Sequence, residues 1–301
     1  MGIPTVSAPR SPWRRRIIVL LAAGALLATL TAGTAITLQV RQPQADLAPT
    51  PAISCVGAPE TLPDGVPTEA ESDPGTAPDG GGLEVVETGF AQIGSMAAPI
   101  TKGSTASLGA VVANTSGHIA YQTKVIFRLL DPEGESATLS TVRDQTREIP
   151  IILPGQEIGI GAGHWVKSRS GRRVEVARVE AVIEGTTWLP ADTPQLTLIT
   201  AHHLETQRYG PDGIDANVRY EIDSPYCQVL ASAGASVLFR DKTGAIVGGG
   251  FDQTKSEQGC RPGESTQSAL LLRSLPPGAD DSMTEVYQYC SPTPDPSASP
   301  N

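Results

Sequence analysis

The strongest fold signal is the stretch Lys124-Val125-Ile126-Phe127-Arg128-Leu129-Leu130-Asp131-Pro132-Glu133-Gly134. Val125, Phe127 and Leu129 recur at every second position, which places their side chains on one face of an extended strand. The four residues from Asp131 to Gly134 are typical of a tight turn. The stretch therefore predicts a half-buried strand that ends in a turn, rather than a helix.

The chain repeats this pattern further on. Three pairs of segments match, at offsets of 113, 110 and 108 residues: Leu83–Thr88 with Leu196–Ala201, Phe127–Gly134 with Val237–Gly244, and Leu153–Glu157 with Arg261–Glu264. The offset drifts slowly in one direction, as it would in two copies of one domain that differ by small loop deletions. The sequence therefore predicts a tandem duplication.

Other alternating or apolar runs lie in both copies, with turn residues between them: 106–113, 148–153, 174–183, 217–222, 245–251, 268–272 and 283–289. No segment beyond Val40 has a convincing helical pattern. We therefore predict an all-β fold of two tandem antiparallel β-sandwiches with about six strands each. The first sandwich covers residues 83–190 and the second covers residues 194–290.

The first copy contains three connected strand-and-turn segments: Gly109–Gly117, Val125–Gly134 and Leu153–Gly155. This pattern resembles the bacterial FxLYD domain, a small immunoglobulin-like module of secreted and membrane-anchored proteins. Leu130 stands where the family has its name-giving tyrosine, and the second copy keeps only Asp241 and Gly244. The resemblance implies two immunoglobulin-like modules that bind or act as spacers outside the cell, and it brings no catalytic residues.

An uncharged stretch from Ile17 to Val40 follows the basic cluster Arg14–Arg16. Its helix would be roughly 36 Å long, enough to cross the ~30 Å hydrocarbon layer. The basic residues predict a cytoplasmic stub at 1–16, a membrane anchor at 17–40 and an extracytoplasmic remainder. The alternative is a cleaved signal peptide ending near Gly33-Thr34-Ala35, which gives a secreted protein. Under either interpretation, the globular part lies outside the cytoplasm.

Proline and glycine dominate two further segments. Residues 41–82 contain eight prolines and end in Gly80-Gly81-Gly82, and residues 291–301 contain four prolines. Such segments are poor at forming ladders, so we predict a disordered linker at 41–82 and a disordered tail at 291–301. The chain carries 22 basic and 32 acidic residues, a net charge of −10, which argues against a nucleic-acid partner.

The four cysteines of an exported chain favour disulfides over a metal site. Alternating up-and-down strands place Cys227, Cys260 and Cys290 at one end of the second sandwich, with Cys227–Cys260 as the favoured pair and Cys227–Cys290 as the alternative. The favoured pair leaves Cys55 to join Cys290 or a second chain. Lipidation of Cys55 is disfavoured, because a lipidated cysteine should directly follow the apolar run.

The chain lacks the motifs of nucleophilic, zinc-dependent and nucleotide-binding enzymes, so we predict no catalytic, cofactor or metal site. His202, His203 and Glu205 could offer metal ligands, but adjacent strand residues point to opposite faces. Asp212–Asp215 slightly resembles part of a calcium loop, although a hairpin turn explains it. Gly248-Gly249-Gly250 favours a bulge or a close backbone approach over phosphate binding.

One basic cluster stands out in this acidic chain: Lys167, Arg169, Arg172 and Arg173. A solvated loop is the simpler interpretation, and contact with an anionic cell-wall polymer or with lipid headgroups is the alternative. The leading hypothesis is a non-catalytic membrane protein whose two modules bind or position an envelope protein or a cell-wall polymer. A passive spacer or assembly subunit is the second hypothesis. An exported hydrolase that uses His164, His202 or His203 is the third.

Overall fold

The computed structural model of this chain describes residues 55–62, 64–67, 74–94, 104–139, 146–169, 172–210, 212–253 and 259–294. Its ladders are antiparallel, and the 3-10 turn η2 (Asp281–Met283) is the helical element of the described residues. The predicted all-β, antiparallel fold class is therefore confirmed. No helix in these ranges has the length and apolar character needed to cross a bilayer. The predicted stub at 1–16 and anchor at 17–40 lie outside the described residues.

The first half of the fold has six long strands: β2 (Leu83–Ile93), β3 (Ser104–Asn114), β4 (Ile119–Leu130), β5 (Thr146–Ile152), β6 (Glu157–Val166) and β9 (Arg178–Leu189). Strands β2-β3-β6 form what we call the first inner sheet. Strands β9-β4-β5 form the first outer sheet, with the short β1 (Val66–Pro67) added at the β9 edge. Phe127 and Ile160 pack together with other apolar residues in the core between these sheets.

The second half also has six long strands: β10 (Thr200–Tyr209), β11 (Asp215–Ser224), β12 (Leu230–Arg240), β13 (Ile246–Asp252), β14 (Gly263–Leu271) and β15 (Glu285–Pro294). Strands β13-β12-β15 form the second inner sheet, and β10-β11-β14 form the second outer sheet. In both halves the first, second and fifth long strands share one sheet, and the fourth, third and sixth share the other. The two halves therefore have the same strand order.

The best-matching part of the repeat forms the same turn in both halves. The amide of Gly134 donates to the carbonyl of Asp131 at 2.9 Å, and that of Gly244 donates to the carbonyl of Asp241 at 3.0 Å. Both glycines have a positive φ, 81° and 89°, which a residue with a side chain rarely adopts. Each aspartate side chain also accepts from a backbone amide four residues later. The turns predicted at these positions are confirmed.

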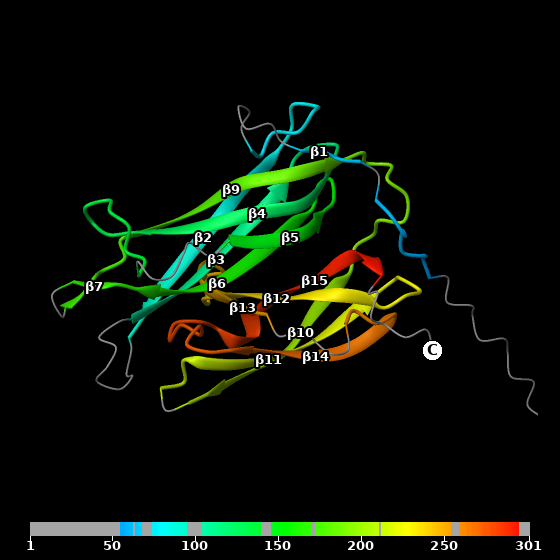
Figure 1. The fold of residues 1–301 in the computed structure, drawn as a ribbon. Helices are drawn as coiled ribbons and strands as arrows, with labels where there is room; N and C mark the ends of the chain where they lie inside the picture. Colours follow the sequence, from blue (N-terminus) through cyan, green and yellow to red (C-terminus); the bar gives the residue numbers. More distant parts are fainter. Residues whose placement is uncertain are drawn as a thin grey trace, which may run out of the picture. The chain divides into compact units, whose positions relative to one another are not determined.

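The two inner sheets pack against each other, so both of their faces are covered (Figure 1). All 11 residues of β3 are buried. Glycines make this close contact possible, because a Cβ on Gly161 of β6 would clash with the carbonyl oxygens of Gly250 and Val237. The amide of Gly161 also donates to Ser236 Oγ at 2.7 Å. The interpretation of Gly248–Gly250 as a close backbone approach is thus confirmed.

Part of the predicted linker belongs to the fold. Val56 forms an isolated bridge with Tyr226 in the second half, and β1 pairs with β9 in the first half. Residues 74–82 also hydrogen bond among themselves and to Thr115. The prediction of a disordered linker at 41–82 is therefore wrong for Val56, for β1 and for residues 74–82, since backbone groups in these parts have hydrogen-bond partners in the fold. The predicted tail is wrong for residues 291–294, which continue β15.

Candidate functional site

An open cavity of about 270 Å³ lies alongside β15 and is the candidate functional site. One wall is formed by residues 286–290 of β15, and a second by residues 197–202, where the chain enters β10. A third wall comes from the end of β5 and the start of β6 in the first half. The lining is mainly apolar and includes Ile151, Ile158, Ile199 and Val286. We call this cavity the β15 groove.

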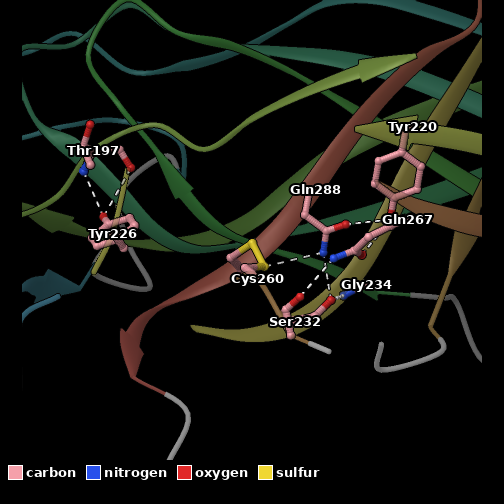
Figure 2. Close-up of a disulfide and its surroundings, with 10 residues drawn as sticks. Thr197, Tyr220, Tyr226, Ser232, Gly234, Cys260, Gln267 and Gln288 are labelled. Carbon is pink, nitrogen blue, oxygen red and sulfur yellow. Dashed lines mark hydrogen bonds between the residues drawn. A yellow bond between two sulfur atoms is a disulfide. The ribbon is translucent and has the colours of Figure 1, made fainter. Parts of the chain in front are cut away.

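Leu198 is the most exposed large apolar side chain of the β15 groove, at 42%. The segment that carries it is held by Tyr226, which is only 2% exposed. The Thr197 amide donates to the Tyr226 hydroxyl at 3.0 Å, and this hydroxyl donates back to the Thr197 carbonyl at 3.3 Å (Figure 2). Burial raises the pKa of the Tyr226 hydroxyl above its ordinary value of 10.0. Leu198 is therefore fixed beside the groove by a buried anchor.

Behind β15, a buried polar network supports the groove (Figure 2). Gln288 accepts a hydrogen bond from the Tyr220 hydroxyl at 2.7 Å and donates to Ser232 Oγ at 2.8 Å. The Gln288 amide also lies 3.7 Å from Cys260 Sγ. Tyr220 and Ser232 come from β11 and β12, so the network links both sheets of the second half. It fixes the position of β15, because buried polar groups resist losing their partners.

The structure corrects the predicted disulfides. The four cysteines form the pairs Cys55–Cys227 and Cys260–Cys290, with Cα–Cα distances of 5.1 and 6.2 Å. The expectation that the cysteines are disulfide-bonded is confirmed. The favoured Cys227–Cys260 pair, the alternative Cys227–Cys290 pair and the leftover Cys55–Cys290 pair are wrong.

The sheet register explains this pairing. Cys260 forms a bridge with Leu230 at the start of β12, and Cys290 pairs with Ser232 on the same strand. Both sulfurs thus meet inside the core of the second half, where Cys260 is 0% and Cys290 is 6% exposed. Cys227 instead lies on the exposed β11–β12 loop, next to the bridge that brings Cys55 close.

The basic cluster is a short hairpin rather than an irregular loop. Its two strands, β7 (Ser168–Arg169) and β8 (Arg172–Arg173), pair so that Arg169 lies opposite Arg172. The Lys167 side chain is half-buried and donates to the carbonyl of Ser136. Lys167 is therefore engaged within the fold and is a poor candidate for an anionic polymer. Contact through Arg169, Arg172 and Arg173 stays a prediction.

The histidines do not form one site. His164 is buried on β6 in the first half, whereas His202 is exposed on β10 in the second. A β-bulge follows His203, whose ring nitrogen Nε2 lies 2.8 Å from Thr206 Oγ1. Burial lowers the pKa of His203, and the negative charge of Asp281 opposes part of this shift. In the described ranges, no three His, Cys, Asp or Glu side chains are placed to hold a metal ion.

Other candidates are structural. Trp188 is 2% exposed and lies in the core of the first half. Asp215, from the segment that resembles a calcium loop, accepts a hydrogen bond from the Arg273 amide at 2.7 Å. Glu205 accepts from Gln207 and pairs with Arg219. Asp215 and Glu205 therefore already have partners within the protein.

Sequence reasoning missed the β15 groove, because its walls come from both halves of the fold and from segments that are far apart in the chain, around residues 150–158, 197–202 and 286–290. One signal was available for the packing that helps form it. In Ile158-Gly159-Ile160-Gly161-Ala162-Gly163, apolar residues alternate with glycines, so one face of this strand is nearly bare. Such a face indicates that another backbone approaches closely.

Comparison with known proteins adds no relative: no family model matches the chain, and no curated protein matches it.

Proposed function

We propose that the chain is a non-catalytic, membrane-anchored protein whose two immunoglobulin-like modules bind a partner at the outer side of the cell envelope. The observation that carries this proposal is the β15 groove, an open apolar site held in place by a buried anchor and a buried network. Binding sites of this kind combine apolar walls with a few fixed polar groups.

The two disulfides support the extracytoplasmic address. All four cysteines are paired, and such bonds persist mainly in oxidising compartments outside the cytosol. The anchor at Ile17–Val40 supplies the membrane attachment in this proposal, with the cleaved, secreted form as the alternative.

Part of the strand order supports an immunoglobulin-like arrangement, whereas the FxLYD type rests on the sequence pattern alone. In an immunoglobulin sandwich the third, sixth and seventh strands share one sheet, with the seventh beside the sixth. Each half of this chain has its third and sixth long strands paired in this way, β4 with β9 and β12 with β15. Both halves share this pairing, although their fourth long strands, β5 and β13, lie beside the third rather than with the first, second and fifth. The place beside the sixth strand is filled by β1 in the first half and by no described strand in the second.

The test is binding of the purified chain to isolated envelope material, together with protease treatment of intact cells. We expect retention on the envelope fraction, and we expect external protease to remove the second half from intact cells. Turnover of a substrate, or full protection of the chain in intact cells, would contradict the proposal. Replacing His164 and His203, which do not line the groove, by alanine is the control for hydrolase activity and should leave binding unchanged.

A passive spacer is the second candidate, because the inner sheets join the two halves firmly. Arg240 lies 2.8 Å from Glu87 of the first half and 2.6 Å from Glu285 of the second. A stiff unit of this kind can hold another protein at a fixed distance. Crosslinking in intact cells separates the two candidates, since a spacer keeps its partner when the groove is altered.

A further inference from the structure

The two halves differ at the edge of their sixth long strand. In the first half, β1 lies beside β9, with Val66 opposite Trp188 and Pro67 opposite Thr187 in an antiparallel ladder. In the second half, the sheet ends at β15 within the described residues. The place that a segment from outside the sandwich fills in the first half is thus open in the second.

The β15 groove runs along this open edge. An edge strand presents backbone N–H and C=O groups that another strand can pair with. The apolar residues Ile199 and Val286 line the groove beside these groups, and Leu198 stands exposed at its wall. A site that offers both a strand edge and apolar side chains matches an extended peptide, because such a peptide uses its backbone and its alternate side chains at once.

We propose that the β15 groove binds an extended segment of a partner protein, which pairs antiparallel with β15 as the missing seventh strand. Side chains on one face of this segment are apolar and lie against the wall of residues 197–202, and those on the other face lie towards the end of β5 and the start of β6. The antiparallel direction follows from the β1–β9 ladder in the first half. This proposal rests on the proposed binding function and names the chemistry of its partner.

The strand β1 of a second copy of this chain is a poor occupant of the β15 groove. β1 pairs with β9, and the disulfide Cys55–Cys227 and the bridge between Val56 and Tyr226 hold the residues that precede it against the second half. Donation of β1 to another chain would break these contacts. These contacts argue against β1 of a second copy. We take a separate polypeptide as the occupant, with self-association as an outcome that the test must detect.

The experiment selects a displayed library of random twelve-residue peptides against the full chain. We expect enrichment of peptides with apolar residues at alternate positions. Their affinity should fall roughly tenfold or more in Leu198→Glu, because the carboxylate would lie against the bound apolar side chains. Leu204→Glu is the matched control, since Leu204 is 49% exposed but does not line the groove, and it should bind normally.

Backbone pairing has its own readout. Methylation of alternate backbone nitrogens in an enriched peptide removes donors and should abolish binding, and the unmodified peptide should protect the amides of β15 from hydrogen exchange. No enriched peptide, or enriched peptides that bind Leu198→Glu and the unsubstituted chain equally, would overturn the proposal. A dimer of the chain that Leu198→Glu dissociates would also overturn it, in favour of a second copy.

Envelope binding separates this proposal from the broader function. Suppose that Leu198→Glu retains full binding to envelope material and that no peptide is enriched. The proposal that the β15 groove accepts an extended strand is then wrong, and the broader envelope-binding function stands. If no form of the chain binds envelope material but the peptides bind as expected, the proposal that the β15 groove accepts an extended strand stands. The proposal that its partner lies in the envelope is then wrong.

Discussion

Gly161 shows how one missing side chain sets the distance between two sheets. Its Cα faces the backbone of β12 and β13, and the nearest atoms to a Cβ at this position are carbonyl oxygens, which cannot rotate away. Two residues further along the same strand, Gly163 has only Ser274 Oγ within reach, at 3.6 Å. The glycines of β6 thus have different packing roles although the sequence repeats them evenly.

We expect Gly161→Ala to lower the free energy of unfolding by about 1–3 kcal/mol, since the added methyl group overpacks the contact between the inner sheets. Gly163→Ala is the matched control on the same strand and should stay within about 1 kcal/mol of the unsubstituted chain. Urea denaturation measures both. Equal effects of the two substitutions would mean that the inner sheets are not packed as described.

Three tyrosines make the fold sensitive to alkali: Tyr220 and Tyr289, which are buried, and Tyr287, which is half-buried. Burial raises the pKa of each hydroxyl above its ordinary value of 10.0, so the folded chain holds these protons more tightly than the unfolded chain. The stability they contribute is complete below about pH 10 and is lost as the pH rises above it. We expect the free energy of unfolding to fall above pH 10, and to fall less steeply in Tyr289→Phe. A free energy of unfolding that does not change above pH 10 would contradict the raised pKa of these tyrosines.

Among the strands and turns, local patterns were sufficient for prediction. Side chains that alternate along a strand, such as Val125 and Phe127, reveal its buried face without knowledge of the partner strand. The turns at Asp131 and Asp241 are equally local. The strand β1 could not be predicted, because it has two residues and depends on a partner more than a hundred positions away. The Cys55–Cys227 disulfide could not be predicted for the same reason, since its two cysteines are 172 positions apart in the sequence.

The two disulfides should differ in their resistance to reduction. Cys55 and Cys227 are both exposed, whereas Cys260 and Cys290 are buried in the core of the second half. A reductant can reach the first pair without unfolding the chain, and access governs the rate of thiol–disulfide exchange. We expect mild reduction and alkylation, followed by peptide mapping, to label Cys55 and Cys227 first. In strong denaturant this preference should disappear, and earlier labelling of Cys260 or Cys290 would contradict the structure.

Over the whole molecule, the sequence predicted two similar halves but not their arrangement. The prediction of separate sandwiches treats the outer face of each sheet as solvent-exposed. The inner sheets instead cover each other, and Val111, Leu238 and Ile246 form a small apolar cluster between them. A strand face made of glycines gives only a weak sequence signal for such packing. Hydrophobic periodicity detects apolar side chains, and glycine has none.

Because each inner sheet is buried on both faces, neither half can unfold without exposing part of the other. Unfolding of one half would uncover the glycine face of β6 and the apolar cluster between the inner sheets, and would break the contacts of Arg240 with Glu87. We therefore expect the described part of the chain to unfold in one calorimetric transition, with calorimetric and van't Hoff enthalpies that agree. Gly161→Ala should weaken this coupling and broaden or split the transition, and Gly163→Ala should not. Two resolved transitions in the unsubstituted chain would show that the halves are independent, and the β15 groove, whose walls come from both halves, would then lack a fixed shape.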